Sequence, residues 1–258
     1  MNKKMIIFDI DETLVDNKNK CIWPSTIKAL KKLKENGHDI VIASGRNKSL
    51  LFTIEKIKKY IDHYVLINGQ QILVNGKSIY DNTFKKEDIE RIINDLEKND
   101  IPYGLMSDDD VYMNKANDDV NYSYALFGLD KPKIDKDYYK SKDIYQIWCF
   151  GSNAEVEQIA KGYKDFKFIS WGSYGYDVLP INASKASSIK ILASHLGINM
   201  KDTVAIGDGL NDIEMIKECG IGIAMGNANE KLKEVADYVT DDISKDGLYK
   251  AFKHFNLL

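Results

Sequence analysis

The sequence predicts an α/β protein with a Rossmann-like parallel sheet, helices on both faces, and an inserted α+β unit. Three observations support this prediction. Short apolar runs alternate with amphipathic helical stretches in the first third of the chain, the same alternation returns in the last third, and the middle departs from it. Buried strands that alternate with amphipathic helices are typical of a parallel sheet covered on both faces.

The first third supplies strands, helices and a hairpin. Three apolar runs are long enough for strands and too short for helices, at residues 4–8, 39–43 and 64–67. Apolar residues at helical spacing predict helices over residues 25–36 and 48–60. Asn68-Gly69 opens a hairpin-like stretch, whose own turn is predicted at Asn75-Gly76.

The last third repeats the alternation of strands and helices. We expect helices over residues 185–196, 211–219 and 230–236, and strands over residues 203–206 and 221–225. In sheets of this kind, chemistry collects at the carboxyl ends of the strands.

The middle of the chain, residues 82–183, has a mixed character. Helices are expected at residues 86–98, 117–127 and 153–161, with strands around the hairpin at 107–110, at 144–150, near 168 and at 176–179. We therefore predict a discontinuous core domain of residues 1–81 and 184–258, and an inserted domain of residues 82–183.

Composition excludes several classes of protein. The formal net charge of −3 gives no basic field for nucleic acid or an anionic membrane, and no apolar stretch approaches the roughly 20 residues of a membrane-spanning helix. The apolar run from Met5 stops at Asp9, too soon for a signal peptide. Three widely spaced cysteines favour free thiols, and hence a cytoplasmic protein.

The first strand ends in Asp9-Ile-Asp11-Glu-Thr13. Two carboxylates two positions apart, just past a buried strand, can face the same crevice. The alternative is an exposed turn, because Asp favours turns. An EF-hand is excluded, because no glycine stands at its sixth position and no glutamate at its twelfth.

Two further segments are less specific when taken alone. Ser44-Gly45-Arg46 follows the second strand and can offer a hydroxyl and backbone N–H groups to a phosphate, although Ser44 can also simply cap a helix. Lys185 opens a helix, where its charge opposes the helix dipole. It is either a solvated lysine or the partner of a bound anion.

The segment Gly207-Asp208-Gly-Leu-Asn211-Asp212 follows a strand of the last third. Two glycines, two acids and an asparagine in six residues are more than helix capping requires. If all four segments lie on one sheet edge, Asp9, Asp11, Asp208 and Asp212 converge, and their repulsion calls for a divalent cation or shifted pKa values. Oxygen ligands without nearby His or Cys indicate Mg²⁺, and the inventory fits phosphoryl transfer.

In order, these four segments resemble the four motifs of the haloacid dehalogenase (HAD) superfamily. Asn68-Gly69 after the third strand, and an insert between the second and third motifs, are similar to the Cof-type branch, subfamily IIB, with a C2B cap. The resemblance runs over nearly the whole chain. It implies a Mg²⁺-dependent phosphatase with a HAD core (residues 1–81 and 184–258) and a cap (residues 82–183).

The resemblance also implies a role for each matched residue. Asp9 would attack phosphorus to form an aspartyl-phosphate, and Asp11 would act as the general acid and base. The Mg²⁺ ligands would be Asp9, the backbone carbonyl of Asp11, and Asp208, with Asp212 in support. The phosphoryl group would be held by Ser44, Gly45, Lys185 and Asn211.

Some positions stay open. Many relatives have glycine where this chain has Glu12, so the geometry of that turn is uncertain. Arg46 can bind phosphate or substrate, or pair with an acid. Asp108-Asp109-Asp110 is read as a solvated hairpin tip, and Trp148 and Trp171 as core residues.

The leading functional hypothesis is hydrolysis of a small phosphomonoester, either a sugar phosphate or a phosphorylated cofactor. Phosphotransfer to a second alcohol, as in a hexose phosphate mutase, is the alternative, and a non-catalytic regulatory protein is the third candidate. We expect a small phosphorylated metabolite as partner, neither nucleic acid nor membrane, and a monomer or weak homodimer.

Overall fold

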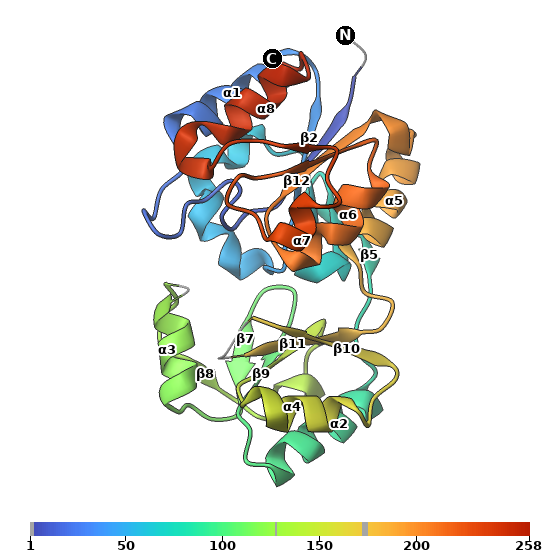
Figure 1. Cartoon of the computed structure of the whole chain (residues 1–258). Coiled ribbons are helices and arrows are strands. Elements are labelled where there is room, and N and C mark those ends of the chain that lie inside the picture. Colours follow the sequence, from blue (N-terminus) through green and yellow to red (C-terminus); the bar gives the residue numbers. More distant parts are fainter. Residues whose placement is uncertain (1–2, 127, 172–174) are drawn as a thin grey trace. The chain divides into compact units, whose positions relative to one another are not determined.

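A computed structural model describes residues 3–126, 128–171 and 175–258, which form two compact units (Figure 1). The first unit contains the residues up to Arg46, then Leu50–Asp81 and Ser184–Leu258. The second contains Asn82–Ala183 and the three residues Asn47–Ser49. The described parts of each unit are taken below by themselves.

The described residues of the first unit form an eight-stranded sheet in the order β14-β13-β12-β1-β2-β3-β4-β5. The six strands from β14 to β3 run parallel, and β4 and β5 are antiparallel additions at one edge. The strands are β1 (Met5–Phe8), β2 (Asp39–Ala43), β3 (His63–Leu66), β4 (Gln71–Val74), β5 (Lys77–Asp81), β12 (Thr203–Gly207), β13 (Ile221–Ala224) and β14 (Tyr238–Val239).

Strand β1 occupies the centre of the sheet and carries no exposed residue. Its last residue, Phe8, pairs with Ile42 of β2 and with Ile206 of β12. The segments that follow these three strands therefore leave the sheet at the same edge. This register brings the first, second and fourth sequence segments together.

Helices cover both faces of this sheet (Figure 1). Helices α1 (Pro24–Glu35) and α8 (Gly247–His254) lie together on one side, and α5 (Lys185–Leu196), α6 (Ile213–Glu218) and α7 (Glu230–Lys233) on the other. The remaining helical elements are short 3₁₀ turns and one long 3₁₀ helix: η1 (Lys48–Tyr60), η2 (Ile67–Gly69), η4 (Met200–Asp202), η5 (Leu210–Asp212) and η6 (Ile243–Lys245). The predicted α/β fold with a parallel-sheet core is confirmed.

Two predicted helices differ in detail from the structure. The helix expected over residues 48–60 is present but is 3₁₀ throughout, which is unusual because 3₁₀ helices rarely exceed four residues. The helix expected over residues 211–219 is split into η5 and α6. The Asp212 carboxylate accepts hydrogen bonds from the backbone N–H groups of Asp208 and Gly209, and these bonds hold the chain in the tight 3₁₀ turn that precedes α6.

The described part of the second unit is a six-stranded sheet, order β10-β11-β9-β6-β7-β8, with helices α2 and α4 on one face. Its strands are β6 (Tyr103–Met106), β7 (Val111–Met113), β8 (Lys133–Ile134), β9 (Gln146–Cys149), β10 (Phe166–Ser170) and β11 (Tyr176–Pro180). Its helices are α2 (Lys86–Lys98), α3 (Asp118–Leu126), η3 (Tyr138–Lys140) and α4 (Asn153–Ala160). Position 127, the expected end of α3, lies outside the described residues.

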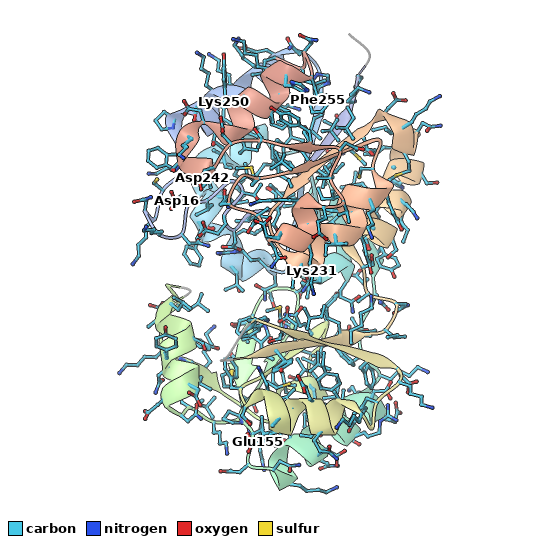
Figure 2. All side chains as sticks on the ribbon, in the orientation of Figure 1. Asp16, Glu155, Lys231, Asp242, Lys250 and Phe255 are labelled. Atoms are coloured by element: carbon cyan, nitrogen blue, oxygen red, sulfur yellow. The ribbon has the colours of Figure 1, made fainter. Side chains whose placement is uncertain are left out.

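The predicted hairpin at residues 107–110 is confirmed as the turn between β6 and β7. Helix α4 begins at a reciprocal cap, in which Ser152 and Glu155 satisfy each other's backbone N–H groups. Glu155 is labelled in Figure 2. None of the helices among the described residues has the length and apolar character that a membrane span requires.

Candidate active site

Three carboxylates converge where β1 and β12 end. Asp9 directly follows β1, and Asp208 and Asp212 follow β12. One oxygen of each carboxylate lies within 4.8 Å of the others. Asp9 is 7% exposed and Asp212 is fully buried, so bulk water does little to screen their mutual repulsion.

Lys185 lies between two of these acids. Its Nζ donates to Asp9 Oδ1 and to Asp212 Oδ1, each at 2.7 Å, and the residue is 2% exposed. Burial acts to lower the pKa of Lys185, but the carboxylates of Asp212 and Asp9 outweigh it and raise that pKa. Lys185 therefore stays charged, and the reading as a solvated lysine is wrong.

The acids carry more charge than Lys185 offsets. Burial raises the pKa of Asp9 to about 7, with Lys185 opposing and the charges of Asp212 and Asp11 contributing. Burial, together with Asp9 and Asp212, raises the pKa of Asp208 to about 9. With all three carboxylates ionised against one ammonium, the site would carry two negative charges, and a bound divalent cation would balance them.

Neighbouring groups hold the Asp208 segment in place. The Thr13 hydroxyl donates to Asp208 Oδ1 at 3.0 Å. A side chain at Gly207 would place its Cβ 2.4 Å from Asp212 Oδ2, so glycine is needed for the approach of that carboxylate. Thr13 was not assigned a role from sequence, although it ends the segment that carries Asp9 and Asp11.

Asp11 points its carboxylate to a different partner. Arg46 Nε and Nη2 donate to its two oxygens at 2.9 and 2.7 Å, and Asn17 Nδ2 donates to Oδ1 at 2.9 Å. Burial acts to raise the pKa of Asp11, but the hydrogen bonds and charge of Arg46 outweigh it and lower that pKa. Of the alternatives open for Arg46, pairing with an acid is the one observed.

Glu12 adopts the conformation that glycine favours. Its φ is 54°, in the left-handed region, and its N–H donates to the carbonyl of Val15 at 2.8 Å. Its own carbonyl accepts from Asn227 Nδ2 at 2.8 Å. The turn after Asp11 thus keeps its left-handed geometry without a glycine, which answers the question that the sequence left open.

The expected phosphate ligands lie next to this acidic cluster. Ser44 is 1% exposed and directly follows β2, the neighbour of β1. Its Oγ accepts from the backbone N–H of Arg46 at 3.2 Å. Asn211 donates from Nδ2 to Asn68 Oδ1 at 3.1 Å, and the Asn68 amide lies against Gly45.

The structure thus brings most of the sequence-derived residues to one sheet edge within the first unit. Asp9, Asp208, Asp212 and Lys185 form one contiguous group, whereas the Asp11 carboxylate belongs to the pair with Arg46. The assignment of metal binding to Asp11 concerned its backbone carbonyl and stays a prediction.

Comparison with known proteins adds the family. The sequence matches haloacid dehalogenase-like hydrolases over residues 6–252. The chain belongs to this family. YkrA of Bacillus subtilis (strain 168) is 35% identical over 263 residues, covering 100% of each chain.

Other members of the family are named for their substrates. The 5-amino-6-(5-phospho-D-ribitylamino)uracil phosphatase YcsE of B. subtilis (strain 168) is 27% identical and covers 98% of this chain and 96% of its own. The HAD subclass IIB sugar phosphatase BT4131 has a solved structure that superposes with a TM-score of 0.92 at 30% identity, over 99% of this chain and 100% of that one. The prediction of a HAD phosphatase of subfamily IIB is confirmed.

Proposed function

We propose that this HAD phosphatase hydrolyses a small phosphomonoester, either a sugar phosphate or a phosphorylated cofactor, with Mg²⁺ and through an aspartyl-phosphate on Asp9. The observation that carries the proposal is the buried group of Asp9, Asp208, Asp212 and Lys185. This group offers a carboxylate as nucleophile, further carboxylate oxygens as metal ligands, and the ammonium of Lys185, all at one edge of the sheet.

The donor set fits a divalent metal ion. Asp9, Asp208 and the backbone carbonyl of Asp11 would hold it, with Asp212 in support. Carboxylate and carbonyl oxygens suit Mg²⁺, and the raised pKa values of Asp9 and Asp208 are those of acids in need of a cation. When bound, the ion would supply neutralisation of charge on the transferring phosphoryl group.

The nucleophilic step is assigned to Asp9. Its carboxylate oxygen forms a bond to phosphorus while the bond from phosphorus to the ester oxygen breaks, and the leaving oxygen takes a proton. Lys185, fixed by two acids, presents positive charge beside Asp9, and Ser44 and the Gly45 backbone supply donors for phosphoryl oxygens. Water then attacks the aspartyl-phosphate and releases inorganic phosphate.

Asp11 is the proposed general acid and base. It would give its proton to the leaving alcohol in the first step and take one from water in the second. The fork of Arg46 fixes the orientation of its carboxylate. Protonation of Asp11 therefore competes with this ion pair, so transfer of the proton requires the pair to loosen.

The relatives support this proposed substrate class. YcsE is named for 5-amino-6-(5-phospho-D-ribitylamino)uracil, and BT4131 is described as a sugar phosphatase. We expect a metabolite of similar size here. The free thiols of Cys21, Cys149 and Cys219 support a reducing compartment such as the cytoplasm.

The test is release of phosphate from a panel of sugar phosphates, nucleotides and phosphorylated cofactors, with Mg²⁺ and with EDTA. We expect turnover that needs Mg²⁺ and falls at least about 10³-fold in Asp9→Asn. Full turnover by Asp9→Asn would refute the mechanism. Transfer of phosphate within the substrate, with little free phosphate, would favour the mutase alternative.

A further inference from the structure

The turn that follows β3 has an unusual backbone. Ile67, Asn68 and Gly69 have φ values of 53°, 52° and 94°, so three consecutive residues lie in the left-handed region. Ile67 is β-branched, and such residues rarely adopt a positive φ. Backbone strain of this kind persists only where surrounding contacts impose it, and it gathers at functional sites.

The turn is fixed by the loop that follows β2. The N–H of Asn68 donates to the carbonyl of Ser44 at 3.0 Å, and the N–H of Ile67 donates to the carbonyl of Arg46 at 3.1 Å. These two bonds flank Gly45, so the turn and the proposed phosphate-binding loop form one hydrogen-bonded unit.

On its other side the turn meets helix α5. The Ser188 hydroxyl donates to the carbonyl of Gly69 at 2.5 Å, and a Cβ on Gly69 would lie 2.2 Å from the carbonyl oxygen of Ser184. Lys185 starts this helix. The turn is thus held between the segments that supply Ser44 and Lys185.

The Asn68 side chain makes the third connection. It is 4% exposed, and its Oδ1 accepts from Asn211 Nδ2 at 3.1 Å. A Cβ on Gly45 would lie 3.2 Å from Asn68 Nδ2, and a Cβ on Gly209 would lie 2.6 Å from Asn211 Oδ1. The Asn211 amide is therefore held by Asn68 through its Nδ2, and its Oδ1 lies close to the backbone of Gly209.

We propose that Asn68 is a positioning residue, which orients the Asn211 amide toward the phosphoryl group and uses the strained turn to hold that orientation. The inference rests on the proposed function, because it takes Asn211 as a phosphate ligand. Asn68 acts through Asn211 and needs no contact with the substrate.

The test is a double-mutant cycle of Asn68→Gly and Asn211→Ala. Glycine tolerates the left-handed backbone and removes the whole side chain, including the amide. We expect Asn68→Gly to lower kcat/KM about 10- to 100-fold and to weaken binding of orthovanadate, a phosphate analogue. In the Asn211→Ala background the same change should have little further effect, because the two residues act as one unit.

Asn75→Gly is the matched control. Asn75 lies outside the site, in the turn between β4 and β5, and has a φ of 51°. Asn75→Gly therefore makes the same chemical change as Asn68→Gly at a residue with the same left-handed backbone. We expect it to retain wild-type kcat/KM. The proposal would be overturned if Asn68→Gly left kcat/KM unchanged. It would also be overturned if the decrease in kcat/KM caused by Asn68→Gly added to the decrease caused by Asn211→Ala.

Orthovanadate affinity tests the role of Asn68 separately from the proposed phosphatase function. If the wild-type protein releases phosphate from no substrate in the panel, the proposed function fails. Coupling between Asn68 and Asn211 in orthovanadate affinity, measured by calorimetry on all four proteins, still decides the role of Asn68. Thermal unfolding of each variant shows whether a decrease in kcat/KM or in orthovanadate affinity comes from misfolding.

Discussion

At the scale of single residues, the first unit concentrates buried charge at one point. Lys185 is in contact with two acids and almost without solvent. Removing one member of a buried ion group leaves the other charges buried without a partner. The free energy lost in this way is larger than the stability that the intact group contributes. The same residues that would bind phosphate thus also determine how stable the unliganded site is.

Lys185→Met should destabilise the protein strongly. It leaves Asp9 and Asp212 buried without their cation, and we expect a loss of about 3–5 kcal/mol in the free energy of unfolding by urea. Lys190→Met, on the same helix, is the control, because Lys190 is half exposed and pairs with Glu218 at the surface. It should change stability by less than about 1 kcal/mol. Equal losses in the two variants would contradict this account of Lys185.

Asp11→Asn should affect substrates according to their leaving group. An alkyl phosphate needs a proton on its departing oxygen, whereas p-nitrophenolate leaves without one. We expect kcat for a sugar phosphate to fall about 10²- to 10⁴-fold, and kcat for p-nitrophenyl phosphate to fall much less. Steady-state kinetics on both substrates measure this. A uniform loss would show that Asp11 has another role.

At the scale of elements, the parallel sheet made much of the site predictable. Asp9, Ser44 and Asp208 each follow a strand, and neighbouring parallel strands end at one edge, so their convergence follows from order alone. Asn68-Gly69 indicated a turn after β3, but the positive φ of Ile67 was not predictable, because isoleucine carries no local signal for it. The pairing of Arg46 with Asp11 depends on the shapes of two separate loops.

The loop between α1 and β2 gives the fold a sensitivity to acid. His38 is 1% exposed and its Nδ1 accepts from the backbone N–H of Lys4 at 3.1 Å. Burial, with the nearby charge of Lys4, lowers the pKa of His38 below its usual 6.5. The unfolded chain therefore takes up a proton at a higher pH than the folded chain does.

The contribution of neutral His38 to the free energy of unfolding should accordingly be fully present above pH 6.5. It should decrease as the pH falls from 6.5 toward the lower pKa of folded His38. His38→Asn keeps an acceptor for Lys4 and removes the titration. We expect its unfolding temperature to vary less between pH 7 and pH 5 than that of the wild type. The same slope in both proteins would show that other groups cause the acid sensitivity.

At the scale of the whole molecule, each unit has a core of its own. The apolar core of the second unit runs from Phe84 to Val178 and includes no residue of the first. Its two ends are neighbours, since Asn82 Nδ2 donates to Asn182 Oδ1 at 3.4 Å. The described chain divides into units between Asp81 and Asn82 and between Ala183 and Ser184, with residues 47–49 grouped with the second unit.

We predict that a fragment of residues 82–183 folds alone. It keeps its whole apolar core and loses the contacts of residues 47–49, among them two hydrogen bonds from Asn47 to the carbonyls of Ser107 and Asp110. Far-UV circular dichroism should show helix and strand, with a single cooperative urea transition. A fragment without cooperative unfolding would refute the prediction.

The proximity of Asn82 and Asn182 has a consequence for how such chains diversify. A segment whose ends meet can be exchanged by one recombination event, and the recipient needs to bridge only a short gap. Every proposed chemical residue lies outside that segment. An exchange of that segment would therefore leave the proposed chemical residues unaltered, provided that the new segment also accommodates Asn47.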